Sequence, residues 1–573
     1  MTGHRPAHAP MADSVECDLL IVGSGAAGLC AALTAAHHGL KVIVAEKAPV
    51  LGGTTAWSGG WIWAPGNQVC ARAGTTDSPK AAETYLRAAL GDHYDPALVD
   101  TFLAQAPQMV GFLETHTAVQ FEAGSHIPDT YGHLPGAGTG GRSVIAAPYD
   151  GRALGPLISL LRRPLRETTF RGLTIQAGAD LRAFMTMTRS PRAFAHVARR
   201  MARHLWDLVR HGRAMQLRNG SALVARLIRS AADLGVEFRP DSPSIRLISQ
   251  GDAVVGAVLQ CGAQQVQVRA THGVVLASGG FPHDAARRAA QFPANATHVT
   301  LAVPTAAGDG LRMAEAIGAT QGITASPGAW CPVSLVRWPD GHEAAFPHII
   351  ERGKPGIIAV LPNGQRFCNE GLGYHDFVTA LLAATPPGHV PQAWLIATRR
   401  FQRRYGLGIS RPFPVPLRPW LRRGYLKTGQ TPEALAMACG IDPAGLRTTL
   451  DQWNRHAAQG SDPQFHRGTT AYMRLQGDSS VKPNPCVAPI DQPPFVAVRV
   501  IPGSFGTFAG LQTDASARVL CDGRAIPGLY AAGTDMRSVM GGHYPAGGIN
   551  LGPALTFGYV AALHAAGKLD ATP

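Results

Sequence analysis

The sequence predicts an α/β protein whose main domain is built on a parallel sheet and is split along the chain by an inserted α+β domain. Three observations predict this. A short apolar segment, 17–22, is followed by a Gly-rich turn, an Ala/Leu-rich helical segment and a second apolar segment, 41–45. That strand–helix–strand order is typical of a parallel sheet. Two more strand-like segments, 273–279 and 528–533, occur far along the chain, and 573 residues are too many for one hydrophobic core.

The turn after the first strand has the G-x-G-x-x-G spacing, at Gly23, Gly25 and Gly28. The first glycine allows a tight turn, the second lets the backbone approach a pyrophosphate, and the third lets helix and strand pack closely. The helix start offers free N–H groups and a positive dipole end to phosphates. Glu46 ends the second strand, where an acid can bind ribose hydroxyls. These features together predict a Rossmann-like dinucleotide-binding domain.

A second Gly-rich loop, 51–60, follows the second strand. Its small residues and hydroxyl groups suit contacts with a phosphate and with a flavin ribityl chain, so the expected cofactor is FAD. Near the C-terminus, the segment 547–553 leads into a helix whose start would stabilise negative charge on a reduced flavin. The residues expected to bind FAD are Gly23, Gly25, Ala26, Ala27, Gly28, Glu46, Lys47, Gly53, Thr54, Thr55, Ser58, Gly59, Gly60, Ser278, Gly279, Gly533, Asp535, Gly548, Asn550 and Leu551.

The positions of these segments predict the domain organisation. We expect a flexible tail over 1–14, the FAD-binding domain over 15–281 and 500–573, and a substrate-binding domain over 282–499. A basic helical insertion is expected at about 155–218. Between 161 and 218 it carries 13 arginines against 3 acids. Apolar residues recur at helical spacing over 194–209, which predicts a basic amphipathic helix. Such a helix either packs on its own domain or lies on an anionic membrane surface.

The composition excludes several classes. The formal charge of +14 is compatible with nucleic acid, a membrane surface or an anionic cofactor, but no nucleic-acid-binding motif accompanies it. The 9 cysteines are scattered, with no CxxC pair, which favours a reducing cytoplasm over a disulfide framework. No apolar run is long enough to span a bilayer, and the first fifteen residues lack the apolar core of a signal peptide. No Cys/His spacing suggests a metal site.

Taken together, these segments resemble the superfamily of FAD-dependent fumarate reductases and 3-ketosteroid dehydrogenases, over 18–566. The segment 364–370 is similar to the superfamily's G-x-R-F-x-N-E motif. Four residues after its Glu, fumarate reductases have the arginine that protonates the substrate. This chain has Tyr374 there, as in the 3-ketosteroid Δ1-dehydrogenases, where a tyrosine removes the carbon-2 proton. The carboxylate-gripping His and Arg of fumarate reductases align with Gly541 and Pro545.

The run 544–553 is similar to the steroid dehydrogenases' Y-P-G-P-G-A-T-I-G-P segment. In that family the tyrosine hydroxyl and the backbone N–H of the fourth residue after it bind the 3-keto oxygen; the matching residues here are Tyr544 and Gly548. The family's P-D-Y-Y-P-E-like segment holds a second tyrosine that assists the base. This chain has Thr130 and Tyr131 there, so Tyr131 is the candidate, although Thr130 is an alternative match.

The resemblance therefore implies a dehydrogenase that introduces a C=C bond next to a ketone. Tyr374 would take the α-proton, assisted by Tyr131. Tyr544 and Gly548 would hold the carbonyl oxygen, and hydride would pass to N5 of FAD. The implied partners are a hydrophobic, steroid-like cyclic ketone and an external electron acceptor such as a quinone. FAD should be non-covalent, because the loop Thr54–Gly60 lacks the histidine that bonds FAD covalently in succinate dehydrogenase-like relatives.

A tyrosine base needs help, because an unperturbed tyrosine has a pKa of about 10. Arg366 could supply positive charge, and His375 and His543, which adjoin the two tyrosines, could tune the site. Two alternatives stay open. One is a fumarate reductase-like enoate reductase that recruits Arg352 or Arg366 for a carboxylate, and the other is a flavin-binding electron carrier without substrate chemistry.

Overall fold

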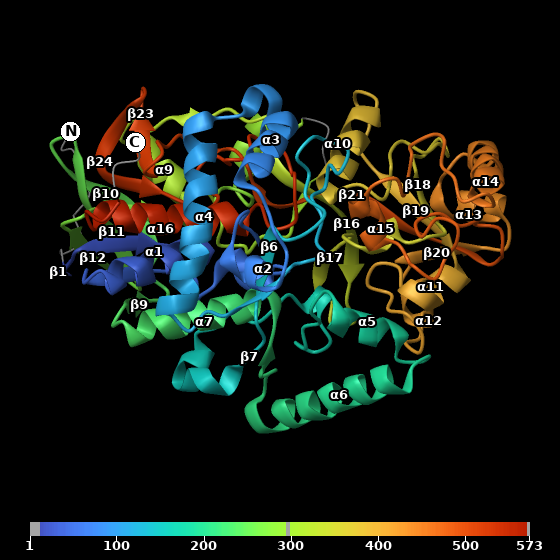
Figure 1. Ribbon diagram of the computed structural model, residues 1–573, viewed down its shortest axis with the longest axis horizontal. Helices are drawn as coiled ribbons and strands as arrows, with labels where there is room; N and C mark the ends of the chain where they lie inside the picture. Colours follow the sequence, from blue (N-terminus) through green and yellow to red (C-terminus); the bar gives the residue numbers. More distant parts are fainter. Residues whose placement is uncertain (1–11, 294–297, 570–573) are drawn as a thin grey trace, which may run out of the picture.

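The computed structural model describes residues 12–293 and 298–569 (Figure 1). Its central sheet has six strands in the order β23-β24-β13-β2-β3-β9. The strands are β23 (Arg518–Cys521), β24 (Arg524–Ala531), β13 (Val274–Leu276), β2 (Leu19–Val22), β3 (Val42–Ala45) and β9 (Glu237–Arg239). Five of them, β24, β13, β2, β3 and β9, pair in parallel along the sheet. The α/β fold and its Rossmann-like sheet are confirmed, and strands from three distant parts of the chain meet in it.

Helices α1 (Ala26–His37) and α16 (Leu551–Ala565) pack against each other beside this sheet. Their contact is close because it involves glycine: a Cβ atom on Gly558 would lie 2.4 Å from the Ala27 carbonyl oxygen. A Cβ atom on Gly28 would lie 2.0 Å from the Gly23 carbonyl oxygen. The small residues of the first motif thus bring the starts of α1 and α16 to one edge of the sheet. The long helix α4 (Pro96–His116) and α7 (Asn219–Asp233) flank this pair.

Two smaller sheets adjoin the central one. The first has the order β1-β12-β11-β10, from β1 (Ala12–Cys17), β12 (Gln264–Ala270), β11 (Ala253–Cys261) and β10 (Ser244–Gln250). Residues 12–14 of the expected tail therefore belong to a strand, and residues 1–11 lie outside the described residues. The second has the order β4-β6-β5, from β4 (Trp61–Trp63), β6 (Ser143–Ala146) and β5 (Phe121–Ala123).

The inserted segment has its own mixed sheet, in the order β17-β16-β21-β19-β18, with β14 and β20 also pairing with β21. Its strands are β14 (Val299–Thr300), β16 (Gly328–Arg337), β17 (Glu343–Pro347), β18 (Ile357–Val360), β19 (Ala393–Thr398), β20 (Leu426–Gly429) and β21 (Phe495–Thr507). Strand β21 runs across the expected boundary at 499/500, so one strand carries the chain from one part to the other. We keep the domain bounds as a proposal.

Helices cover the inserted sheet on the right of Figure 1. They are α10 (Tyr374–Ala384), α11 (Arg399–Tyr405), α12 (Arg418–Arg422), α13 (Pro432–Cys439), α14 (Pro443–Ala457) and α15 (Ala471–Gln476). The buried strands β18 and β19 and the apolar faces of α13 and α14 form a second core, which includes Ile358, Ile396, Leu435, Leu450 and Trp453.

The basic insertion contains α5 (Ala179–Thr186) and α6 (Pro191–His211), which lies along the lower margin of Figure 1. The predicted helix over 194–209 is present and buries Val197, but several of its large apolar residues do not face the protein. Arg200, His204 and Asp207 are buried under it, whereas Phe194, Trp206 and Val209 are exposed by 57%, 63% and 84%. Within residues 12–293 and 298–569, no helix combines the length and the hydropathy needed to span a membrane.

Candidate active site

The first Gly-rich turn forms an open cradle at the start of α1. Gly23 has φ +104°, where a side chain would strain the backbone and meet the Ala277 carbonyl oxygen at 2.3 Å. A Cβ atom on Gly25, by contrast, would come within 4 Å only of the Thr55 hydroxyl, at 3.7 Å. That hydroxyl accepts a hydrogen bond from the N–H of Ala26 (3.0 Å). The backbone at Gly25 therefore leaves room for a phosphate beside the helix start.

Glu46 lies at the end of β3, beside this turn, as predicted. Its carboxylate accepts hydrogen bonds from the backbone N–H groups of Ser24 (3.0 Å) and Ala48 (2.9 Å). Lys47 points elsewhere, because its ammonium group pairs with Asp309 at 2.8 Å. Both carboxylate oxygens of Glu46 are thus engaged within the protein, and Lys47 ties the turn to helix α9 (Asp309–Glu315).

Some residues of the second Gly-rich loop lie beside the first Gly-rich turn, and others pack within the protein. Gly53 and Thr55 belong to the short helix η1 (Gly53–Trp57) next to Gly25. The Thr54 hydroxyl accepts a hydrogen bond from the N–H of Val303 (3.1 Å), which ties the loop to the inserted segment. The Ser58 hydroxyl donates to the Thr55 carbonyl (2.8 Å). Gly59 has free space around it, whereas Gly60 packs against Asn219, so Gly60 serves the fold more than the cradle.

Asp535, expected at the cofactor, holds a neighbouring loop. Its fully buried carboxylate accepts hydrogen bonds from the N–H and hydroxyl of Ser278 and from the N–H of Gly280 (2.8 Å). These hydrogen bonds hold the loop that contains Ser278 and Gly279 against the end of β24. Both carboxylate oxygens of Asp535 are engaged within the protein.

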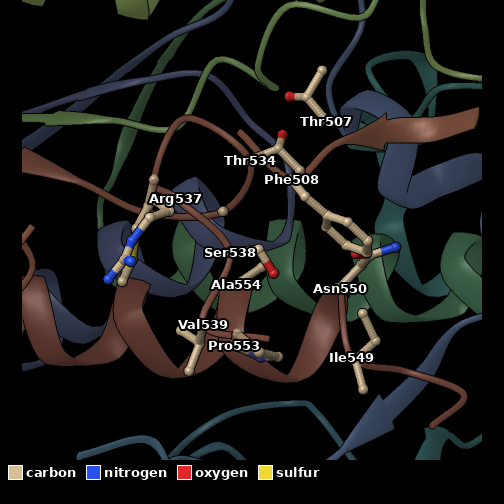
Figure 2. Close-up of a pocket in the computed structure, with 12 residues that line it drawn as sticks. Thr507, Phe508, Thr534, Arg537, Ser538, Val539, Ile549, Asn550, Pro553 and Ala554 are labelled. Atoms are coloured by element: carbon tan, nitrogen blue, oxygen red, sulfur yellow. The ribbon is translucent and has the colours of Figure 1, made fainter. Parts of the chain in front are cut away.

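A small cavity of about 20 Å³ lies between the end of β24 and the start of α16 (Figure 2). Helix α16 has no acid in its first turn and no side-chain cap on its N-terminus, so its positive end is uncompensated. The hydroxyl of Thr507 is buried and has no hydrogen-bond partner among the residues that the structure describes. An elongated, polar, anionic cofactor such as FAD would satisfy both features, so the residues present fit this group. The cavity is lined by Thr507, Phe508, Gly533, Thr534, Met536, Arg537, Ser538, Val539, Ile549, Asn550, Pro553 and Ala554.

The two predicted tyrosines meet close to this cavity. Tyr374 is the first residue of α10, and Tyr544 lies in the loop that leads to α16. Their rings pack edge to face, with centroids 4.8 Å apart. The Tyr544 hydroxyl accepts a hydrogen bond from Nδ2 of the cavity residue Asn550 (3.2 Å). The structure thus brings together two tyrosines that are 170 positions apart in the sequence.

Gly548 lies at the same place, against β4. Its carbonyl oxygen accepts a hydrogen bond from the N–H of Trp63 (3.2 Å). Its φ is +105°, and a Cβ atom there would lie 2.6 Å from the Trp63 nitrogen. Both the left-handed backbone and the close approach require glycine. Leu551, another residue expected to bind FAD, is the first residue of α16.

Tyr131 also reaches the site. Its hydroxyl donates a hydrogen bond to Oδ1 of Asp376 (2.9 Å), two residues after Tyr374. Its backbone N–H donates to the Tyr85 hydroxyl (3.2 Å), which itself donates to the carbonyl of Pro545 (2.5 Å). Thr130 donates its N–H to the same carbonyl (2.8 Å). Both candidate residues therefore lie beside the tyrosine pair, and Tyr131 is the one bonded to α10.

Tyr374 is protonated in this arrangement. Burial and the adjacent Tyr544, to which it is hydrogen-bonded, raise the pKa of Tyr374 well above its usual value. Arg366 does not lower it, because its guanidinium pairs with Glu370 (2.7 Å) and Asp462 (2.8 Å) in a buried network. Arg352 donates to the backbone carbonyls of His348 (2.8 Å) and Glu370 (2.9 Å). Both guanidinium groups are committed to the fold.

The neighbouring histidines serve packing. Nδ1 of His375 accepts a hydrogen bond from the N–H of Trp330 (3.1 Å), and burial lowers the pKa of His375 to about 3. Burial, followed by the nearby His93, also lowers the pKa of His543. Both imidazoles are therefore neutral at ordinary pH, and His375 holds the start of α10 against β16.

Residues at this site that were not predicted include Tyr85, Asp376, Tyr472 and Thr507. Tyr472, on α15, interacts with Tyr374 and Tyr544 and with the Thr130 side chain. No spacing in the sequence marks Tyr472 or Thr507. Asp376 had a weak signal, an acid in the first turn of a helix that starts with the expected base.

Comparisons with known proteins agree with this geometry. The family model described as "FAD binding domain" matches residues 18–551. The 4-oxocyclohex-2-ene-1-carboxylate 5-dehydrogenase of Sinomonas cyclohexanicum is 40% identical over 550 residues, which cover 95% of this chain and 93% of that protein. The 3-oxosteroid 1-dehydrogenase of Mycobacterium tuberculosis is 35% identical over 565 residues, which cover 96% of this chain and 98% of that protein.

A solved structure is similar along almost the whole chain. It is the 3-ketosteroid Δ1-dehydrogenase of Sterolibacterium denitrificans in complex with 1,4-androstadiene-3,17-dione. The TM-score is 0.89 at 35% identity, with coverage of 97% of this chain and 100% of that one. The resemblance inferred from the motifs is confirmed. The chain belongs to the FAD binding domain family, as an FAD-dependent oxidoreductase of the superfamily that includes the 3-ketosteroid dehydrogenases.

Proposed function

We propose that this enzyme introduces a C=C bond next to the carbonyl group of a hydrophobic cyclic ketone. The observation that carries the proposal is the Tyr374–Tyr544 pair, with ring centroids 4.8 Å apart beside the flavin cavity. One hydroxyl is available to polarise a carbonyl and the other to take a proton. No cation is among the groups that set the pKa of either hydroxyl in the described part of the chain, so the pair suits a neutral ketone.

Tyr544 and the backbone N–H of Gly548 hold the carbonyl oxygen in this proposal. As it gains enolate character, each hydrogen-bond donor stabilises it by about 3–4 kcal/mol, as in an oxyanion hole. Polarisation acidifies the adjacent C–H group, and Tyr374 takes that proton. Bound FAD supplies the oxidant, which accepts hydride from the next carbon. An external acceptor such as a quinone then removes the electrons.

The walls around the tyrosines favour an apolar substrate. Tyr374 packs against the ring of Phe505 (5.3 Å between centroids), and Tyr544 against Phe508 (6.0 Å). Leu301, Val333 and Ile501 form a buried apolar cluster against which Tyr374 packs. These side chains support a steroid-like ketone. The relative named for a 4-oxocyclohexene carboxylate makes a smaller, charged cyclic ketone the second candidate substrate.

The remaining alternatives have less support. An enoate reductase of the fumarate reductase type needs a cation for the substrate carboxylate, and Arg352 and Arg366 are both engaged elsewhere. Gly541, at the position of the clamp histidine, lies against His93 with no room for a side chain. A mere electron carrier would have no use for a ketone-binding pair beside the cavity.

We also propose that α6 rests on an anionic membrane surface. Its outward side carries Phe194, Leu205, Trp206 and Val209, and the arginines Arg192, Arg199, Arg203 and Arg210 line the adjoining exposed side. An apolar stripe edged with positive charge is the pattern of a helix that lies in the plane of anionic lipid. Such a position would bring the enzyme close to an apolar ketone and to a quinone.

Turnover with two substrates tests the proposed chemistry. The FAD-loaded enzyme is incubated with an artificial electron acceptor and either a 3-keto-4-ene steroid or 4-oxocyclohex-2-ene-1-carboxylate, and the products are analysed by mass. Loss of two hydrogens from the steroid supports the proposal. Loss of two hydrogens from the keto acid alone would assign the enzyme to the smaller, charged class of substrate. Hydrogenation of an unsaturated acid by reduced enzyme, without ketone oxidation, contradicts it.

A further inference from the structure

The proposed reaction leaves one problem unsolved, namely where the proton of Tyr374 goes before this residue can act as a base. Within the described residues, no cation is among the groups that shift the pKa of Tyr374 most strongly. An acceptor for its proton is therefore required. Among the described residues that interact with the tyrosine cluster, Asp376 carries the carboxylate that is hydrogen-bonded within it.

The two carboxylate oxygens of Asp376 have different surroundings. Oδ1 accepts the hydrogen bond of the Tyr131 hydroxyl at 2.9 Å. Oδ2 is sealed from solvent and has no hydrogen-bond partner in the described part of the chain. Burying a carboxylate oxygen without a hydrogen-bond partner lowers the stability of the fold. Such a group in a native structure therefore points to a functional role. Asp376 therefore has both a bonded tyrosine and a free acceptor oxygen within one turn of Tyr374.

Gly373 shows that the fold makes room for this carboxylate. Its φ of −54° is accessible to any residue, so the backbone does not require glycine. A Cβ atom there, however, would lie 2.4 Å from Oδ2 of Asp376 and 3.0 Å from Cγ2 of Thr130. Space for the carboxylate, and not backbone conformation, explains the glycine that precedes Tyr374.

Tyr131 connects the carboxylate to the ketone site. The segment that carries it is held at Pro545, the residue after Tyr544, through the Tyr85 hydroxyl. The Tyr131 hydroxyl also interacts with the Tyr544 backbone. Because its proton is donated to Asp376, its oxygen can only accept a further hydrogen bond from the site.

We infer that Asp376 is a positioning residue for the proposed dehydrogenation, which orients Tyr131 as an acceptor and receives its proton. The Tyr374 hydroxyl is hydrogen-bonded to Tyr544 in this arrangement, so the step requires it to turn to the Tyr131 oxygen. As the Tyr374 proton then passes to the Tyr131 oxygen, the Tyr131 proton moves to Asp376. Two O–H bonds break and two form. Tyr374 becomes the anionic base and Asp376 a neutral acid. This inference rests on the proposed function.

The ionisation of Asp376 supports the same assignment. Burial raises its pKa to about 6, against lowering by Tyr131 and, more weakly, by Arg352. The other titratable groups that face it are Tyr85 and Tyr472. The carboxylate is the form that accepts a proton, so activity should be lost as the pH falls below about 6.

Asp376→Asn tests the inference in the FAD-loaded enzyme. We expect kcat to fall by about tenfold or more with KM unchanged, and the low-pH limb of the wild-type profile to disappear. Gly373→Ala keeps the charge but displaces the carboxylate, and should lower kcat in the same way. Asp491→Asn, at an exposed acid, is the control. Wild-type kcat together with an unchanged low-pH limb in Asp376→Asn would overturn the inference.

Infrared titration gives a readout that does not depend on turnover. The carbonyl stretch of a protonated carboxylic acid should appear as the pH is lowered through about 6, and be missing from Asp376→Asn. Tyr131→Phe removes a hydrogen bond that lowers this pKa, so its midpoint should rise. An unmoved midpoint would refute the Tyr131–Asp376 coupling. If neither ketone is turned over while the midpoint moves as expected, the proposed function fails and the coupling stands.

Discussion

The rings of Tyr374 and Tyr544 meet edge to face, with centroids 4.8 Å apart and planes inclined at 72°. Tyr374 begins a helix of the inserted segment, whereas Tyr544 belongs to the loop before the last helix of the FAD-binding part. Neither part holds both tyrosines by itself. The packing of the two parts therefore assembles the proposed chemistry.

Tyr544→Phe should weaken ketone binding and slow flavin reduction. The substitution keeps the ring contacts with Tyr374 and Phe508 but removes the donor to the carbonyl oxygen. Loss of one such donor costs about 10²–10³ in kcat. Stopped-flow reduction by a 3-keto-4-ene steroid measures the rate, and the perturbed flavin spectrum measures the dissociation constant. Tyr405→Phe, at a tyrosine bonded to Asp478 in the inserted part, is the matched control. An unaltered rate in Tyr544→Phe would remove this residue from the ketone site.

Thr507→Val should weaken FAD binding without destabilising the apoprotein. The Thr507 hydroxyl lines the cavity and is buried without a partner, so its removal relieves the apoprotein of an unsatisfied group worth about 1–3 kcal/mol. The same hydroxyl is expected to bond the cofactor. Thr513→Val is the control, because Thr513 has an equally unpartnered hydroxyl away from the cavity lining. Fluorescence titration of FAD into apoprotein should separate the two variants; equal affinities would show that Thr507 does not contact FAD.

Asp376→Asn should stabilise the protein at alkaline pH. Burial raises the pKa of Asp376 from 3.8 to about 6, so its favourable contribution is present at low pH and is lost as the pH rises through about 6. The neutral amide avoids this loss, which is worth about 3 kcal/mol. Chemical unfolding should show a larger gain in the free energy of unfolding at about pH 8 than at about pH 5, because these values lie on either side of the folded pKa. A variant that is less stable than wild type at both pH values would mean that the carboxylate stabilises α10 more than its burial costs.

Trp206→Ser combined with Phe194→Ser should abolish flotation with anionic liposomes. Both side chains are exposed on the outer side of α6, so their loss removes buried area in lipid but no contact in the protein core. Ile323→Ser, at another exposed apolar residue, is the control and should float like wild type. Equal flotation of wild type and the double variant, or equal flotation with neutral and with anionic liposomes, would count against membrane association through α6.

FAD should be released when the protein is denatured with acid. The loop Thr54–Gly60 contains no histidine to form a covalent bond with the flavin. Flavin absorbance should therefore remain in the supernatant after the protein is precipitated. Flavin that pellets with the protein would show a covalent link at another residue.

The fold of the FAD-binding part could be predicted because its signals are local. The spacing of Gly23, Gly25 and Gly28 and the position of Glu46 follow from short-range geometry, and the structure has the turn, helix and strand where they were expected. Tyr374 and Tyr544 could be predicted as partners only through the resemblance. Their proximity depends on how distant segments pack.

Other features depended on tertiary contacts that no local pattern contains. The periodicity over 194–209 correctly predicted a helix, but periodicity cannot say which face is buried, and the polar face of α6 is the inner one because Asp180 and Thr174 bind Arg200 there. Arg366 looked available for Tyr374 because the acid Asp462, which binds it, lies 96 positions away. Thr507 carries no sequence signal at all.

The central claim is that Tyr374 deprotonates a ketone whose electrons pass to FAD, and anaerobic flavin bleaching tests it most directly. FAD-loaded wild-type enzyme and Tyr374→Phe are titrated with a 3-keto-4-ene steroid without an electron acceptor. We predict that the wild-type flavin bleaches and that Tyr374→Phe binds the steroid but bleaches about 10²–10⁴ times more slowly. Equal bleaching of both enzymes would contradict the role of Tyr374. Reoxidation of pre-reduced enzyme by an unsaturated acid, with no bleaching by the ketone, would contradict the reaction itself.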